Sequence, residues 1–358
     1  MSAADMLTEW RQCVKDQLLP KLSRHQLDAV AGASFAMASA GRCTSGALAS
    51  HLPGEAKAAS HRRQIERLVA NHHVEVVRLF PMLARQVLAN FAGLKLLLIL
   101  DETPGPGELR CLKLSLGYHH RALPLAWCCY REGKLPEPLP ALVQRLICSV
   151  AEVLPQELQV ILLADRGFAW PQLVDLCREL GFGFVLRIQS STRVRLSDGT
   201  IQCAGHWSKE PYDGFAGAVS VFKKAGWRQV HLLCLWEPEA KEPWLLISDR
   251  SGSDAMTRSY AKRMWCEQSF RDEKSGGFHW RDSKIRDPDR AARLLLIMAL
   301  AMILAVMLAS KLIKRGLRRS IDPHRTRRLS YLQLGLRQLQ QLLSRDEPLR
   351  LPAQLYPP

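Results

Sequence analysis

The stretch Leu94-Lys-Leu-Leu-Leu-Ile-Leu100, followed directly by Asp101, decides the fold class. A nearly continuous apolar run of this length is typical of a strand that is buried on both faces of a sheet. Two further runs of strand length follow at 111–119 and 122–130, with short turn-rich breaks between them. Three strands in direct succession favour antiparallel pairing in this part of the sheet.

Strands and helices alternate further along the chain. The pattern predicts a helix at 139–153, a buried strand at 158–164 that ends before Asp165, a helix at 171–180 and a strand at 182–188. Alternation of this kind is typical of parallel strands joined by helices. The sequence therefore predicts an α/β fold with a mixed sheet, antiparallel at first and parallel later, and helices on its faces.

The regions on either side of this core have different patterns. Apolar residues recur at helical spacing before residue 91, short β-like runs fill most of 189–252, and a long helix begins near residue 254. We predict a helical domain at 1–90 that either binds DNA or only packs, the first part of the core at 91–188, a β-rich insertion at 189–252, the second part of the core at 253–312 and basic C-terminal helices at 313–358.

The positive charge lies at the two ends of the chain. The 358 residues carry 50 Lys and Arg against 34 Asp and Glu, a net charge of +16. The excess is +4 in residues 1–90, zero in 91–254 and +12 in 255–358. This distribution suits a protein that lays a long polyanion across itself, although a basic surface that only serves solubility is the other interpretation. The basic segment Lys311–Arg328 is accordingly either a track for DNA phosphates or a charged exit from the helix before it.

One segment raises the question of a membrane. Leu294–Ala309 has sixteen residues without a polar side chain, somewhat fewer than the roughly 20 that a spanning helix needs. We predict a buried core helix and no membrane partner. Ten cysteines without a CxxC motif favour reduced thiols, and residues 1–12 lack the pattern of a secretion signal, so we expect a cytoplasmic protein.

Two carboxylates come directly after predicted buried strands. Asp101 and Asp165 would both stand at the carboxyl edge of the sheet, where ligands bind in open α/β folds. Ionised carboxylates at such a place need a cation, and Mg²⁺ suits them because it also bridges to phosphate oxygens. The alternative is that Asp101 belongs to a turn and Asp165 pairs with Arg166.

A third carboxylate lies on the long helix that begins near residue 254. At about 100° per residue, Tyr260, Arg263, Glu267 and Lys274 project within an arc of about 60°. Such a stripe suits a third metal ligand among groups that hold phosphates. The alternative is a solvated face with ordinary pairing between residues four apart.

These motifs resemble those of a known family. The spacing Tyr260-x2-Arg263-x3-Glu267-x6-Lys274 resembles the signature of the IS4-type transposases, and Asp101-Glu-Thr and Ala-Asp165-Arg-Gly-Phe resemble the two Asp motifs of that family. The resemblance implies a ribonuclease-H-like catalytic core with a β insertion before the Glu-bearing helix. It also implies a DDE triad of Asp101, Asp165 and Glu267.

The resemblance further implies a mechanism and partners. The triad would hold two Mg²⁺ ions, for which Mn²⁺ can substitute, cut double-stranded DNA at terminal inverted repeats and transfer the freed 3′-OH into target DNA. Two ends must meet, which implies a homodimer in a synaptic complex near the nucleoid. In some relatives a Trp of the insertion stacks on a flipped base, and Trp227, Trp236 and Trp244 are candidates here, each also explained as core. The residues expected to contact DNA are Tyr260, Arg263, Lys274, Arg62, Arg63 and Trp244.

Two other functions fit the same residues. One is a nuclease on the same core that cuts without strand transfer, and the other is a non-catalytic DNA-binding protein derived from a transposase. Glu102, next to Asp101, is expected to support the site or face solvent and not to bind metal.

Overall fold

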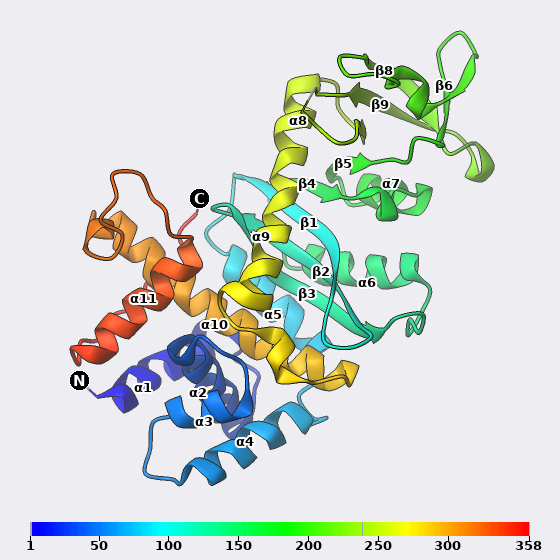
Figure 1. The fold of residues 1–358 in the computed structure, drawn as a ribbon. Coiled ribbons are helices and arrows are strands. Elements are labelled where there is room, and N and C mark those ends of the chain that lie inside the picture. The colour runs from blue at the N-terminus through cyan, green and yellow to red at the C-terminus, as the bar shows by residue number, and fades with distance from the viewer. Residues whose placement is uncertain (1, 156, 238, 358) are drawn as a thin grey trace.

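The structure, a computed structural model, describes residues 2–155, 157–237 and 239–357. Within these ranges the chain forms a mixed ten-stranded sheet with helices on both faces (Figure 1). The strands follow the spatial order β3-β2-β1-β4-β5-β10-β9-β8-β6-β7. Their bounds are β1 Lys95–Pro104, β2 Leu109–Tyr118, β3 Arg121–Arg131, β4 Gln159–Ala164, β5 Gly183–Arg187, β6 Arg193–Arg195, β7 Ile201–Cys203, β8 Gly214–Val221, β9 Arg228–Leu235 and β10 Trp244–Ser248.

The first five strands pair as the sequence predicts. β1 runs antiparallel to β2, and β2 runs antiparallel to β3. β1 and β5 both run parallel to β4, which lies between them. The helices α6 (Leu139–Ala151) and α7 (Pro171–Glu179) connect β3 to β4 and β4 to β5. The predicted mixed α/β sheet is confirmed.

The β-rich stretch after β5 continues the same sheet. β10 returns antiparallel beside β5, with Leu246 opposite Arg187, and β9 and β8 add on beyond it. In Figure 1 the strands β6, β8 and β9 protrude at one end of the molecule. The stretch is thus an extension of the sheet edge that β5 would otherwise leave open, because unpaired edge groups are satisfied by a further strand.

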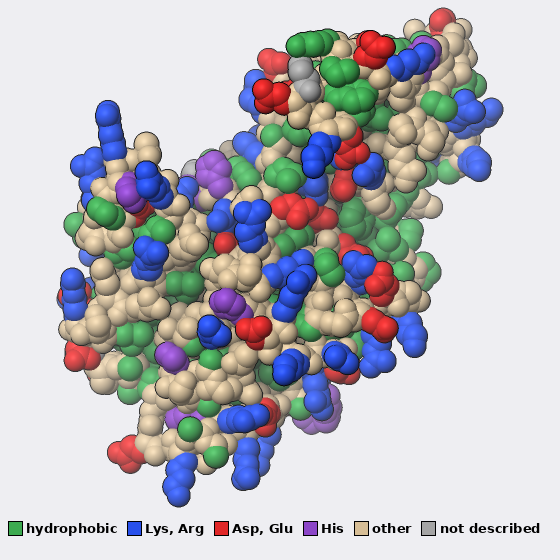
Figure 2. Space-filling model, viewed as in Figure 1, with side chains coloured by type: hydrophobic (Ala, Val, Ile, Leu, Met, Phe, Trp, Pro, Cys, Tyr) green, Lys and Arg blue, Asp and Glu red, His purple; other side chains and the backbone are tan. Residues whose placement is uncertain are grey.

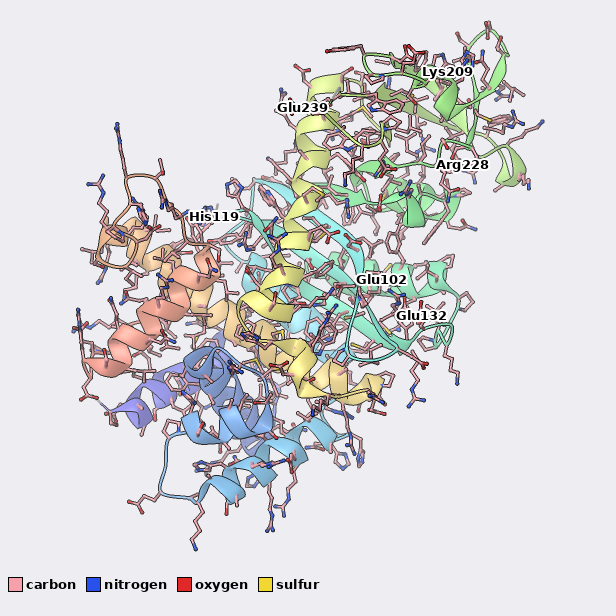
Figure 3. The ribbon with its side chains drawn as sticks, in the orientation of Figure 1. Glu102, His119, Glu132, Lys209, Arg228 and Glu239 are labelled. Atoms are coloured by element: carbon pink, nitrogen blue, oxygen red, sulfur yellow. The ribbon has the colours of Figure 1, made fainter. Side chains whose placement is uncertain are left out.

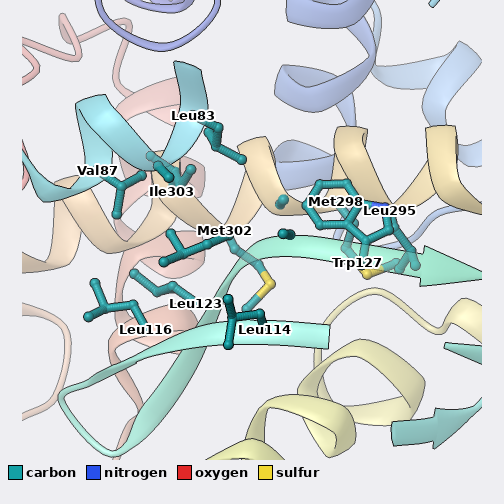
Figure 4. Packing of buried hydrophobic residues seen from close by; sticks show 14 of the residues in the cluster. Leu83, Val87, Leu114, Leu116, Leu123, Trp127, Leu295, Met298, Met302 and Ile303 are labelled. Carbon is teal, nitrogen blue, oxygen red and sulfur yellow. The ribbon is translucent and has the colours of Figure 1, made fainter. Parts of the chain in front are cut away.

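One face of the sheet is covered by apolar helices. α10 (Pro288–Lys314) and α5 (Val76–Leu88) pack on β3, and Figure 4 shows Met298 of α10 beside Trp127 and Ile303 beside Leu83 and Val87 of α5. Of the most apolar 18-residue window of α10, 94% is buried in the protein, although the helix is long and apolar enough to cross a membrane. The prediction of a buried core helix is confirmed.

The terminal helices pack around the same core. They are α1 Ala3–Cys13, α2 Arg24–Ala40, α3 Ser45–His51, α4 Ala58–Ala70 and α11 Tyr331–Ser344. α2 and α11 both lie along α10. The approach of α11 is close because Gly335 has no side chain: a Cβ there would collide with the carbonyl oxygen of Ala305.

The opposite face carries the long helix that the sequence predicts, but this helix is not regular. It consists of α8 (Ser253–Ala261), a 3₁₀ turn at Lys262–Met264, α9 (Trp265–Arg271) and a π-helical turn at Asp272–Gly276. The assumption of uniform 100° steps is therefore wrong for this segment. The wider π turn places Asp272 and Glu273 toward the sheet, where both are buried.

Candidate active site

The two aspartates lie side by side on neighbouring parallel strands. The β1–β4 register ends with Leu100 opposite Ala164, so that Asp101 and Asp165 are the next residues on each. Side chains alternate along a strand, and Leu97 and Ile99 belong to the apolar cluster beneath α8 and α9. Asp101 therefore faces these helices. The expectation that Asp101 follows the strand is wrong, because β1 continues against β2 and pairs Asp101 with Lys113.

Glu267 approaches Asp101 from α9. One carboxylate oxygen of each residue and Sγ of Cys266 all lie within 4.8 Å of one another. Asp165 is not part of this group of three; instead its Oδ1 accepts a hydrogen bond of 3.2 Å from the hydroxyl of Tyr260. The structure thus brings two of the three predicted metal ligands within 4.8 Å of each other and places the third directly after the adjacent strand β4.

Arg263 lies between these carboxylates. Its Nη1 is 2.5 Å from Oδ2 of Asp101 and 4.0 Å from Oε1 of Glu267. Burial raises the pKa of Asp101 above its usual range, and the guanidinium of Arg263 offsets part of this shift. The Nε of Arg263 is buried and has no hydrogen-bond partner within the described part of the chain. This donor is unpaired, and it would reach an anionic oxygen only after a movement of the Arg263 side chain.

Cys266 is a site residue that sequence reasoning missed. Its thiol donates a hydrogen bond of 2.8 Å to Oδ2 of Asp101. Burial, and then the negative charge of Asp101, raises the pKa of this thiol, so it stays protonated and acts as a donor. Its position directly before Glu267 and three residues after Arg263 is a sign that it belongs to the site. A pattern built from charged residues alone does not include it.

Two buried ion pairs fasten the π-helical turn beside this site. Lys113 Nζ lies 2.5 Å from Oε2 of Glu273, and both side chains are only 2% exposed. Arg121 Nε lies 2.5 Å from Oδ2 of Asp272. The Lys113–Glu273 pair was also missed, although a lysine within the apolar run at 111–119 was a visible sign of a buried partner.

The remaining predicted residues of the helix and the insertion lie at different distances from the carboxylates. Lys274 is half-buried, with Nζ 5.8 Å from the ring centre of Phe270. Trp244 packs edge-on against Tyr260, with 5.3 Å between ring centroids. Trp236 instead donates its Nε1–H to the carbonyl of Ala240. Trp227 lies under the guanidinium of Arg195. Of these three tryptophans, Trp244 is therefore the one in contact with a residue of the predicted stripe.

The predicted DNA contacts of α4 are not brought to this site. Arg62 is exposed and pairs with Glu66 at 2.9 Å, and Arg63 is exposed on the same helix. Figure 1 places α4 at the far end of the molecule from β6, β8 and β9, with α9 between. The basic segment after α10 is partly used internally, because Arg318 pairs with Asp322 at 3.3 Å.

The neighbouring acidic and basic residues have other partners. The carboxylate of Glu102 accepts a hydrogen bond from the hydroxyl of Tyr130 and lies 3.8 Å from Nε of Arg110. In Figure 3, Glu102 lies near Glu132, at the end of β1–β3 away from His119. Arg166 pairs with Glu242 at 3.2 Å, so Asp165 lacks the ion pair that the alternative interpretation gave it.

Comparison with known proteins bears on the same residues. Residues 140–304 match the family model described as Transposase DDE domain. No curated protein matches the chain. The matched segment contains Asp165, Glu267 and the whole stripe from Tyr260 to Lys274, whereas Asp101 lies before it. The match supports a DDE transposase family, which implies DNA substrates and nuclease or transferase chemistry.

Proposed function

We propose that this protein is the DNA transposase of an IS4-type insertion sequence. In this proposal it cuts DNA at terminal inverted repeats and joins the freed 3′-OH to target DNA. The strand order β3-β2-β1-β4-β5, with β1–β3 antiparallel and β1, β4 and β5 parallel, supports a ribonuclease-H-like core. The position of β6–β9 between β5 and the Glu-bearing helix supports the expected insertion.

The observation that carries the proposal is the close approach of Asp101 and Glu267. Asp165 follows the neighbouring parallel strand, at the level of Asp101. Oxygen atoms of Asp101 and Glu267 lie within 4.8 Å of each other although they come from distant parts of the chain. A buried carboxylate beside a second one needs positive charge nearby. The guanidinium of Arg263 supplies that positive charge here. A divalent cation would compensate the two carboxylates in the same way.

The donor set fits a hard divalent cation. Asp101, Asp165 and Glu267 would hold Mg²⁺ or Mn²⁺ through carboxylate oxygens, the ligand type that these ions prefer. Bound there, such ions would supply activation of a water or 3′-hydroxyl and stabilisation of the leaving oxygen.

The protein's own side chains would position the DNA. Arg263 would turn its free Nε–H to an oxygen of the scissile phosphate, since a guanidinium recognises phosphate with paired donors. Tyr260 holds Asp165 in place through its hydroxyl. Lys274 would contact a neighbouring phosphate, and Trp244 beside Tyr260 offers an aromatic face for an unstacked base. Arg62 and Arg63 would contact DNA outside the active site.

Replacement of Glu267 by Gln tests the proposal. The change removes a ligand charge and keeps the shape, so strand cleavage in Mg²⁺ should fall on the order of 10³-fold or more while DNA binding persists. The matched control is Glu102→Gln, because Glu102 is bonded to Tyr130 instead of facing the carboxylates. Cleavage that survives Glu267→Gln contradicts the assignment.

The products of the same assay separate the candidate functions. The substrate is DNA that carries the inverted repeats flanking the reading frame. Strand-transfer products support the transposase, cleavage alone identifies a nuclease, and bound but uncut DNA identifies a non-catalytic binding protein. The proposal includes a homodimer that joins two ends, and a cytoplasmic location at the nucleoid.

A further inference from the structure

A basic pocket lies near the candidate active site, and none of its residues takes part in the proposed function. It has a volume of about 690 Å³ and lies between the loop Pro104–Gly107 and the segment that joins the π-helical turn to α10. The residues that line the pocket and carry charge are Arg281, Lys284 and Arg286. Figure 2 shows Lys and Arg side chains gathered over this part of the surface. We call this site the basic pocket.

The three cations of the basic pocket are exposed and have no acidic partner within 4.0 Å among the described residues. The acids of the same segment are engaged elsewhere: Asp282 lies 4.0 Å from Arg42, and Asp287 accepts the backbone N–H of Arg290 at 2.9 Å. Glu108 lines the adjoining hollow with Arg131 and Arg286. Asp282, Asp287 and Glu108 offset part of this charge from outside the pocket, and the pocket itself keeps a local excess of positive charge, which attracts an anion.

The walls of the basic pocket are held in place. Trp280 is fully buried, and a Cβ at Gly105 would meet its ring at 2.9 Å, so the loop can lie there only with glycine. Gly107 has a φ of 63°, and a Cβ there would meet Nε of Arg286 at 3.4 Å. Because loop and segment pack directly on each other, the backbone positions that carry the three cations are fixed relative to the sheet.

The basic pocket is connected to the carboxylates by a short chain of contacts. Asp101 pairs with Lys113 across β1 and β2, and Nζ of Lys113 lies 5.6 Å from the ring centre of Trp280. Burial, and then the nearby charge of Arg281, lowers the pKa of Lys274. Lys274 and Arg281 are thus near enough for their charges to interact.

We propose that the basic pocket binds backbone phosphates of the DNA strand that passes through the active site; this inference rests on the proposed function. Pro104 is three residues beyond Asp101, a distance of about 10 Å at the rise of an extended strand. Backbone phosphates advance about 3.4 Å per nucleotide along a duplex. The pocket therefore lies within reach of phosphates a few nucleotides from the scissile one.

The salt dependence of DNA binding tests this inference. The variant Arg281→Gln/Lys284→Gln/Arg286→Gln and the wild type are titrated with a labelled 40-base-pair duplex in Ca²⁺, across a series of NaCl concentrations. Each lost phosphate contact reduces the slope of log K against log salt by about 0.9. The expected result is a slope smaller by about two to three and an affinity roughly tenfold to a hundredfold lower near 0.15 M salt.

A control with equal charge loss separates a specific site from general attraction. Lys209, Lys223 and Lys224 are exposed in the β extension, and Figure 3 shows Lys209 near the end of the molecule that β6, β8 and β9 form, away from Glu102 and Glu132. The triple Gln variant of these lysines should keep at least two thirds of the wild-type slope of log K against log salt.

The outcomes distinguish the two proposals. If the wild type binds and cuts DNA but the pocket variant has the wild-type slope, or the control loses as much, the basic pocket is not a phosphate site and the proposed function stands. If the wild type fails to bind any duplex even at low salt, the proposed function fails with it.

Discussion

The two faces of the sheet differ in what they bury. The face under α5 and α10 is covered by a large continuous cluster of Leu, Met, Ala and aromatic side chains. The face under α8 and α9 has a small apolar cluster and, beside it, the buried charges of Asp101, Lys113, Arg263, Asp272 and Glu273. Apolar burial stabilises a fold, whereas buried charges are costly unless paired. The first face thus holds the structure together, and the second gives up part of that stability at the candidate active site.

The largest effect on stability is expected from a change on the apolar face, which tests whether this face holds the structure together. Gly335→Ala should destabilise the protein by about 3 to 5 kcal/mol, because the new methyl group meets the backbone of Ala305 and forces α11 away from α10. Urea unfolding measures the loss.

A matched control for that variant is Gly46→Ala in α3. A Cβ at Gly46 meets nothing within 4 Å, so this change should be neutral or stabilise by about 0.5 to 1 kcal/mol. Equal behaviour of the two variants would show that the close approach of α11 does not hold the apolar face together.

The polar face is tested by the pair Lys113–Glu273. Burial works to lower the pKa of Lys113, but the adjacent Glu273 leaves it raised, so the lysine is charged. Lys113→Met strands the carboxylate of Glu273 in the interior and should cost about 3 to 5 kcal/mol. The double variant Lys113→Met/Glu273→Leu should recover most of this loss.

Unfolding free energies of Lys113→Met, Glu273→Leu, the double variant and the wild type form a double-mutant cycle. A coupling below about 0.5 kcal/mol would mean that the two charges do not compensate each other, and the contrast between the faces would lose its main example.

A smaller effect concerns the border of the apolar face at α11. His119 stacks on the ring of Tyr331 with 4.1 Å between centroids, and Figure 3 shows it near the turn between β2 and β3. Burial, then the charges of Arg327 and His120, lowers the pKa of His119 to about 4. The unfolded chain binds this proton below about pH 6.5 and the folded chain does not. Stability should therefore fall as the pH drops from about 6.5 to 4.

The size of the pH effect is about 1 kcal/mol, because His119 is only half-buried and solvent screens its charge. His119→Asn keeps a residue that tolerates the positive φ of 44° and removes the titrating ring. The difference in unfolding free energy between the two proteins should shrink across this pH range. A difference that stays constant from pH 7 to 4 contradicts the assigned pKa shift.

The sequence was most informative where local pattern determines structure. The apolar runs before Asp101 and Asp165 predict the two parallel strands, and the composition of Leu294–Ala309 predicts the core helix. The period of two along a strand also explains why both aspartates lie on the sheet face under α8 and α9.

Other features depend on partners that are distant in sequence. The pairing of β10 with β5 and the bond from Cys266 to Asp101 cannot be read from local pattern. The π turn at Asp272–Gly276 could not be predicted for the same reason. Its residues Asp272 and Glu273 form ion pairs with Arg121 and Lys113 of the sheet.

The most direct test of the central claim is the position of Mn²⁺ in crystals of the protein with bound DNA, located by anomalous diffraction. The account predicts a peak in coordination distance, about 2.0 to 2.3 Å, of oxygens of Asp101, Asp165 and Glu267, with Arg263 moved from Asp101 to a phosphate. A peak that involves none of these carboxylates, in a protein that still cuts DNA, would contradict it.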